Sequence, residues 1–142
     1  MTSQFEPDGS IKLTWQPVSG AQSYVVHYGN ANVTDAKQLT FMGYTETNSF
    51  TLPASEVPAN TPGDKLTFAV QTFAKTGEGA DDIAKAEYLN TKASGSAWSD
   101  LTAVATKPTD ANTVDQIKAW LDTNKIDYTG KTAKADLLAL VK

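Results

Sequence analysis

The chain has 142 residues, of which 40% are hydrophobic, 9% aromatic and 20% charged, and its formal net charge at pH 7 is −4. This composition is typical of a globular protein, and the length allows one domain with a small additional module. The chain has no cysteine and a single histidine, which excludes disulfides, thiolate metal sites, a cysteine nucleophile and any site that needs two imidazoles.

The chain shows no sign of a membrane-spanning or export segment. No stretch approaches the ~18–20 consecutive apolar residues that a spanning helix needs. Residues 1–6 lack the basic and apolar regions of a signal peptide. We therefore expect a soluble protein that is made in the cytoplasm.

Residues 10–107 have the pattern of short β-strands. Apolar and polar residues alternate there, and segments rich in glycine and proline separate the alternating runs. About seven strands of this kind predict an antiparallel sandwich whose core is formed by one face of each sheet. The predicted core residues are Trp15, Tyr24, Val26, Leu66, Phe68 and Val70.

Residues 75–97 form a long polar segment between two predicted strands. The stretch from Asp81 to Leu89 predicts one or two helical turns, and residues 94–96 predict the return. Loops at the ends of a sandwich commonly carry binding sites, so Asp81, Asp82 and Tyr88 are candidate partner-binding residues. A tolerated surface insertion is the alternative interpretation.

The residues that would support catalysis do not form a recognisable pattern. His27 alternates with the apolar residues of its strand, which predicts a solvated side chain on the face opposite the core. No serine lies in a nucleophile-elbow context, and the acids of residues 78–87 lack the spacing of a calcium loop. We expect a protein that is not an enzyme and has no metal and no cofactor.

Residues 110–142 change to a helical period. Val114, Ile117 and Leu121 lie on one stripe, and Thr113 with Gln116 forms a capping-box pattern. An extended link follows at residues 126–130. A second short helix is predicted from about Ala133, with Thr132 as its N-cap and with an apolar side formed by Leu137, Leu138 and Val141.

Four segments of the β-rich part together resemble strands B, C, F and G of a fibronectin type III domain. They are residues 13–17, 24–28, 66–74 and 98–106, which contain the tryptophan-x-proline, tyrosine-x-valine-x-tyrosine and closing threonine patterns in order. The resemblance implies an immunoglobulin-like sandwich over residues 1–107, with Trp15 as its central core aromatic. Two departures are Leu66, at the usual position of the strand-F tyrosine, and the long segment 75–97.

Residues 110–142 resemble a helix–extended loop–helix module, a group similar to the SAP and LEM modules. The resemblance rests on residues 113–122, 126–132 and 134–141. Such modules and fibronectin-like domains recur in virion structural proteins of tailed bacteriophages. The pair therefore implies a phage or prophage accessory protein of the head or tail, located in the virion. Its partners would be capsid or tail subunits, or another copy of the chain. The candidate contact residues are Trp120, Tyr128, Lys131 and Lys134.

Two other functions remain open at this point. A SAP-like module would bind DNA, with Lys131 and Lys134 near the contact. Five acids nevertheless cancel five lysines in residues 108–142, and the chain has no arginine, which disfavours nucleic-acid binding. The second alternative is an adhesion domain that binds a host-surface glycan through an aromatic platform of Trp98, Tyr44 and Phe41.

Overall fold

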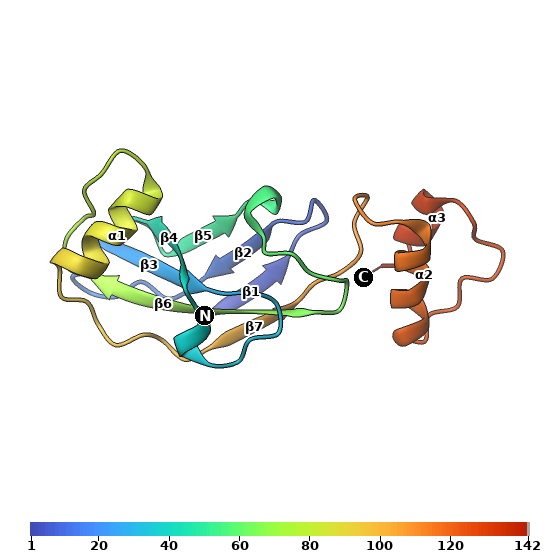
Figure 1. Ribbon diagram of the computed structural model, residues 1–142, viewed down its shortest axis with the longest axis horizontal. Coiled ribbons are helices and arrows are strands. Elements are labelled where there is room, and N and C mark those ends of the chain that lie inside the picture. Colours follow the sequence, from blue (N-terminus) through green and yellow to red (C-terminus); the bar gives the residue numbers. More distant parts are fainter. Residues whose placement is uncertain (142) are drawn as a thin grey trace.

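The computed structural model describes residues 1–141, which form a two-sheet unit followed by a helix pair (Figure 1). Within these residues, seven strands build a three-stranded sheet in the order β1-β2-β5 and a four-stranded sheet in the order β4-β3-β6-β7, and every strand pairing is antiparallel. The predicted β-rich, antiparallel fold is confirmed. The strands are β1 (Thr2–Phe5), β2 (Ile11–Thr14), β3 (Ser23–Tyr28), β4 (Phe41–Thr45), β5 (Ser49–Leu52), β6 (Lys65–Phe73) and β7 (Thr102–Ala105), and two short 3-10 helices are η1 (Ala36–Gln38) and η2 (Ala54–Glu56).

The main core lies between the two sheets, because alternate residues of each strand point toward the opposite sheet. Trp15 lies at the edge of this core, not at its centre. It follows the last residue of β2, and its ring meets Tyr24 edge to face with centroids 5.2 Å apart. Phe68 is the fully buried aromatic of this cluster. The buried members are Ile11, Leu13 and Leu52 of one sheet and Tyr24, Val26, Tyr28, Leu66, Phe68 and Val70 of the other.

The two sheets also meet where β4 turns into β5. Phe50 of β5 places its ring directly over Gly43 of β4, which lies on the other sheet. A Cβ atom at position 43 would lie 2.7 Å from Cε2 of Phe50, closer than carbon atoms approach without displacement. A side chain at position 43 would therefore displace the Phe50 ring from this contact between the sheets.

The outer face of the four-stranded sheet is covered in part by helix α1 (Asp82–Lys92). Ala86 and Leu89 of α1 form a second buried cluster with Val25, Tyr44 and Phe73. The helix is longer than the one or two turns predicted. Its N-cap is Asp81, whose Oδ1 accepts a hydrogen bond from the backbone N–H of Ala84 at 2.8 Å. Because both faces of the sheet are covered here, all six residues of β3 are buried.

The helix pair consists of α2 (Val114–Thr123), α3 (Lys134–Leu138) and the loop between them. The predicted capping box is confirmed, since the Thr113 side chain accepts from the backbone N–H of Gln116 and the Gln116 side chain accepts from that of Thr113. The prediction that Thr132 caps the second helix is wrong. This helix begins one residue later than predicted, so its N-cap is Ala133, which has no side chain that could cap it.

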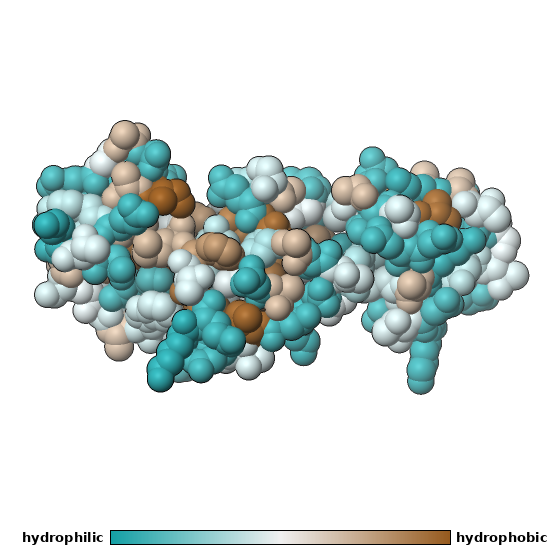
Figure 2. All heavy atoms as spheres, viewed as in Figure 1, coloured by the Kyte–Doolittle hydropathy of each residue, from teal (hydrophilic) through white to brown (hydrophobic). Residues whose placement is uncertain are grey.

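The insertion helix and the helix pair lie at opposite ends of the molecule (Figure 1). The predicted boundary at residues 107–110 falls between β7 and α2. Figure 2 shows that hydrophobic residues on the viewed face form separate small groups within a largely hydrophilic surface. None of the helices in the described residues has the length and apolar character that a membrane crossing requires.

Candidate partner-binding site

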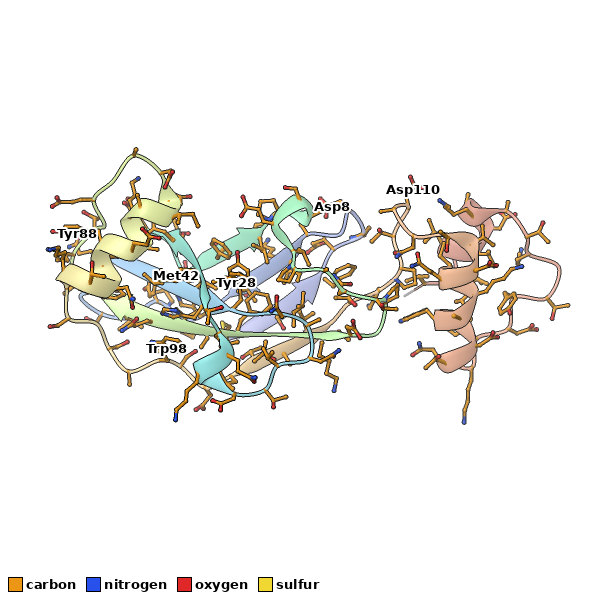
Figure 3. All side chains as sticks on the ribbon, in the orientation of Figure 1. Asp8, Tyr28, Met42, Tyr88, Trp98 and Asp110 are labelled. Carbon is orange, nitrogen blue, oxygen red and sulfur yellow. The ribbon has the colours of Figure 1, made fainter. Side chains whose placement is uncertain are left out.

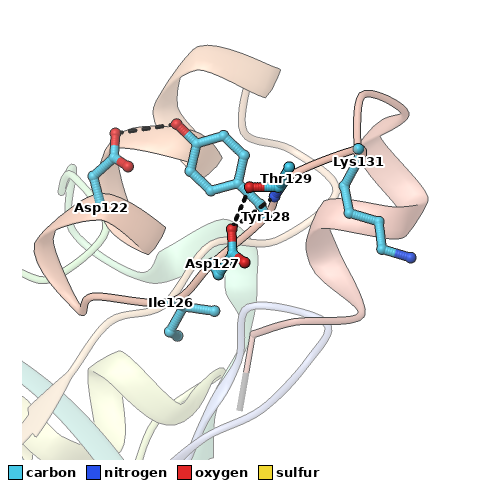
Figure 4. Close-up of a pocket in the computed structure, with 7 residues that line it drawn as sticks. Asp122, Ile126, Asp127, Tyr128, Thr129 and Lys131 are labelled. Atoms are coloured by element: carbon cyan, nitrogen blue, oxygen red, sulfur yellow. Dashed lines mark hydrogen bonds between the residues drawn. The ribbon is translucent and has the colours of Figure 1, made fainter.

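The loop of the helix pair forms a cavity of about 410 Å³, and this cavity contains two of the four residues predicted there (Figure 4). Tyr128 and Lys131 line it together with Asp122 and Asp127. The Tyr128 hydroxyl donates to Oδ2 of Asp122 at 3.2 Å, and the Thr129 backbone N–H and hydroxyl both donate to Oδ1 of Asp127. These bonds order the loop and leave the Lys131 ammonium directed away from them.

The same bonds change the pKa values of the loop. Partial burial of its ring, followed by the hydrogen bond and negative charge of Asp122, raises the pKa of Tyr128 above its ordinary value. The hydrogen bonds from Thr129 lower the pKa of Asp127. Both residues therefore keep their usual charge states at neutral pH, and the cavity presents two carboxylates, a phenol and an ammonium group.

The other two predicted residues of the helix pair lie at its junction with the two-sheet unit. Trp120 approaches the loop before β6, where its Cδ1 would lie 3.8 Å from a Cβ placed on Gly63. The Nζ of Lys134 donates to the backbone oxygen of Asp110 at 3.1 Å. Trp120 therefore lies near the two-sheet unit and Lys134 binds the linker, whereas Tyr128 and Lys131 face the loop cavity. Sequence spacing did not distinguish these two sides of the module.

A groove of about 380 Å³ runs between the two units. It is bounded by the end of β1, by the linker and by the last residues of the helix pair. Phe5, Pro108, Leu138 and Val141 supply its apolar walls. Leu138 and Val141, which were predicted on the buried side of the second helix, are only partly buried and also line this groove.

The three predicted residues of the insertion are at the far end of the molecule from the helix pair. Figure 3 places Tyr88 on α1 and Asp110 at the start of the helix pair. Asp81 is occupied as the N-cap, and Asp82 is exposed in the first turn. The Tyr88 hydroxyl accepts from Nζ of Lys75 at 2.9 Å and lies 3.3 Å from Oε1 of Glu78, to which it donates. Of the three candidates, Tyr88 therefore holds the start of the insertion to α1.

The three aromatic residues proposed as a glycan platform do not share a surface. Tyr44 is 5% exposed, and its hydroxyl donates to Oε1 of Glu46 and accepts from the backbone N–H of Gly77. Phe41 pairs with Tyr28 of the inter-sheet core, whereas Trp98 stacks on the opposite face of the sheet. The predicted platform is therefore wrong as a single surface.

His27 is buried, which overturns the prediction of a solvated strand histidine. It does point away from the inter-sheet core, but it is only 2% exposed because Trp98 covers it, with ring centroids 3.8 Å apart and planes 12° from parallel. Its Nε2 lies 3.1 Å from Oε1 of Gln71. Burial lowers the pKa of His27, and the hydrogen bond to Gln71 opposes that change. The length of segment 75–97 is the feature of the sequence that could have indicated the burial of His27. A segment of this length can cross the outer face of the sheet and bring residue 98 over it.

Potential metal ligands are dispersed. Within residues 1–141, no group of three or more histidine, cysteine, aspartate and glutamate side chains is arranged to hold a metal ion. The arrangement that the structure does present is one of contact surfaces: a polar cavity and an apolar groove on or beside the helix pair, and a charged helix at the other end.

Comparison with known proteins includes a match to part of the chain. No family model matches the chain, and no solved structure gives a significant match. A stretch of 40 residues is 62% identical to part of the large ribosomal subunit protein bL20 of Oenococcus oeni. This stretch is 28% of the chain, and the chain spans about a fifth (20%) of the length of that protein.

Proposed function

We propose that this chain is a non-enzymatic accessory protein of a bacteriophage or prophage virion, which acts through protein–protein contact. In this proposal the two-sheet unit is a fibronectin type III-like domain. The strand order supports it: β2 lies in one sheet and β3, β6 and β7 lie in the other. In an immunoglobulin-like sandwich, strand B likewise lies in one sheet, and strands C, F and G lie in the other.

The observation that carries the proposal is the end-to-end arrangement of the molecule. The helix pair occupies one end, and the insertion helix α1 occupies the other (Figure 1). A protein that attaches to a particle through one end and presents the other end to its surroundings needs this separation. The position of Trp120 near Gly63 and the hydrogen bond of Lys134 to the linker residue Asp110 support this arrangement, because both place the helix pair close to the two-sheet unit.

The helix pair is the proposed attachment module. Its loop cavity offers Lys131 and the carboxylates of Asp122 and Asp127 to a polar partner surface, and the groove beside it offers Leu138 and Val141 to an apolar side chain. A capsid subunit, a tail subunit or another copy of this chain would bury these groups. Burial of an apolar centre surrounded by polar contacts is the usual composition of a specific protein interface.

The test is co-sedimentation with particles of the phage or prophage whose structural genes flank the gene for this chain. The full chain should co-sediment, and a chain lacking residues 110–142 should not, while circular dichroism shows that its two-sheet unit remains folded. A matched pair of charge reversals refines the test. Lys131→Glu, in the loop cavity, should weaken co-sedimentation, whereas Lys37→Glu, at an exposed position of η1, should not. Undiminished binding of the shortened chain would reject attachment through the helix pair.

The purified full-length chain can also be used to test the nucleic-acid alternative. The partial similarity to a ribosomal protein is a reason to make this test. Lys134 is already bound to a backbone oxygen, and five acids balance the five lysines of residues 108–142. Few phosphates would therefore be neutralised. We expect no anisotropy change with labelled duplex DNA or RNA, even at about 10 mM salt, where phosphate contacts are strongest. Binding that disappears as salt is raised would favour the alternative.

A further inference from the structure

Past Phe68, the edge of β6 is bound by residues 94–101, which precede β7 in the chain and do not form a regular strand. The regular pairing of β7 extends along β6 only from Lys65 to Phe68. Two serines continue it. The Ser99 N–H donates to the oxygen of Val70 at 2.8 Å while its hydroxyl accepts from the Val70 N–H at 2.9 Å, and Ser96 makes the same pair of bonds with Thr72 at 2.9 and 3.0 Å. Each serine therefore satisfies both backbone groups of one β6 residue.

This pairing shifts the chain and turns Trp98 over the sheet. Regular continuation from the pair Phe68 and Thr102 would place residue 100 opposite Val70 and residue 98 opposite Thr72. The observed partners are Ser99 and Ser96, so the segment contains one extra residue between Thr102 and Ser99 and a second between Ser99 and Ser96. Such bulges redirect side chains. Here the redirected side chain is Trp98, which lies over the outer face of the sheet and stacks on His27.

Gln71 links His27 to the same segment. Its Nε2 donates to the backbone oxygen of Ser96 at 3.1 Å, so its Oε1 is the atom that faces Nε2 of His27. Since Oε1 only accepts, Nε2 of His27 carries the hydrogen in the neutral ring. A second proton would have to be placed on Nδ1, and His27 lies between Met42 and Ala69 on the neighbouring strands. The Met42 thioether is only a weak acceptor, and the Ala69 side chain has none.

We propose that residues 94–101 form an acid-sensitive latch, in which protonation of His27 releases Trp98 and the two serines and exposes the edge of β6. The latch is held by three groups of contacts: the Trp98 stack on His27, the Gln71 bridge from His27 to Ser96, and the serine pairs with β6. A positive charge on a ring that is 2% exposed is desolvated. Opening the latch returns that charge to water.

The charged groups around the latch leave this desolvation largely uncompensated. Met42, Ala69, Gln71 and Trp98, which surround the ring from β4, β6 and the latch, are uncharged. On α1 and the segment before it, Lys85 lies over the Tyr44 ring, and Lys75 and Glu78 bind Tyr88. Asp100 is the single charged residue of the latch itself. These are the groups whose titration must be separated from that of His27.

The direction of the pH effect follows from proton linkage. Burial lowers the pKa of His27 in the closed latch, while the open latch returns the ring to its ordinary value near 6.5. The open form therefore binds more protons between these two values, and acid favours it. The attraction between an imidazolium and the Trp98 ring acts in the opposite sense, so the latch requires that desolvation of the 2% exposed ring outweighs this attraction. The open population should rise up to about tenfold for each pH unit below about 6.5, until the pH reaches the pKa of His27 in the closed form.

Two measurements on the full chain test the proposal. His27 is the single histidine, so its ring resonances in a ¹³C-edited NMR titration give its pKa directly. We expect a value below 6.5. Amide hydrogen exchange, corrected for intrinsic rates, should show the protection of the Val70 and Thr72 N–H groups falling as the pH is lowered from 7.5 to 4.5. The amide of Val26, in the middle of β3 and paired with strands on both sides, should stay protected.

Two variants separate His27 from other titrating groups. His27→Phe keeps an aromatic ring under Trp98 but does not titrate, so the acid-dependent loss of protection at Val70 and Thr72 should disappear. Asp100→Asn removes the carboxylate of the latch and should leave that loss unchanged. A His27 pKa at or above 6.5 in the wild-type chain overturns the proposal, as does equal acid opening in His27→Phe. The wild-type titration decides the matter if the His27→Phe variant does not fold.

Discussion

The helix pair should unfold separately from the two-sheet unit when its small core is damaged, and Ile117→Ala is the sharpest such change. Among the described residues, the fully buried part of this core is Ile117, Leu121 and Leu137. The substitution removes three buried carbon atoms, which corresponds to about 2.4 kcal/mol at about 0.8 kcal/mol each. The cavity left behind brings the expected total to about 2–5 kcal/mol.

A loss of this size is comparable to the whole stability of so small a module, because a core of this extent rarely supplies more than about 3–5 kcal/mol. We therefore expect the resonances of α2 and α3 to collapse to unfolded positions in the ¹⁵N–¹H spectrum of the Ile117→Ala full-length chain. Helical ellipticity at 222 nm should fall in parallel. The resonances of the strands should keep their positions, since the main core shares no buried residue with the helix pair.

The matched control is Ile83→Ala on α1, where the same atoms are removed from a side chain that is 48% exposed. Its effect on stability should stay within about 0.5 kcal/mol. The reasoning fails if the helix pair of Ile117→Ala remains folded. It also fails if the strands lose their dispersion together with the helices, because the two units would then unfold as one.

Three further contacts can be tested by substitution and thermal or denaturant unfolding. Thr113→Ala removes the capping box and should destabilise the helix pair by about 1 kcal/mol. The control Thr132→Ala should change stability little, because Thr132 is not the N-cap of α3. Equal effects of the two substitutions would contradict the cap assignment. Tyr44→Phe leaves the Gly77 N–H without its partner and should cost about 1–3 kcal/mol, with loss of amide protection at the start of the insertion. Gly43→Ala should cost about 1–3 kcal/mol, because the added methyl group overpacks against the Phe50 ring. An unchanged melting temperature would show that the Phe50 ring moves freely.

The sequence was informative where structure depends on neighbouring residues. The alternation at Tyr24, Val26 and Tyr28 correctly predicted which face of β3 enters the main core, because side-chain direction alternates along a strand. The Thr113 and Gln116 pair correctly predicted the start of α2, because both hydrogen bonds lie within one turn. These features need no knowledge of the rest of the fold.

The features that the sequence did not predict depend on residues far apart in the chain. His27 has the local pattern of a solvated strand residue, and it is buried because residue 98 folds back over it. Trp120 and Tyr128 belong to the same short module, but Trp120 lies near the two-sheet unit and Tyr128 lines the loop cavity. Which side a residue of a small module presents is decided by how that module docks, and local spacing carries no information about docking.

The serine pairs along β6 also bear on solubility. β6 has nine residues and β7 has four, so without Ser96 and Ser99 the last part of β6 would present unpaired backbone groups to solvent. Exposed edges of this kind recruit strands from other molecules and initiate aggregation. Residues 94–101 block that route with an irregular segment, which a strand from another molecule cannot extend by simple addition. Conditions that open this segment should therefore shorten the shelf life of concentrated protein before they unfold either of its cores.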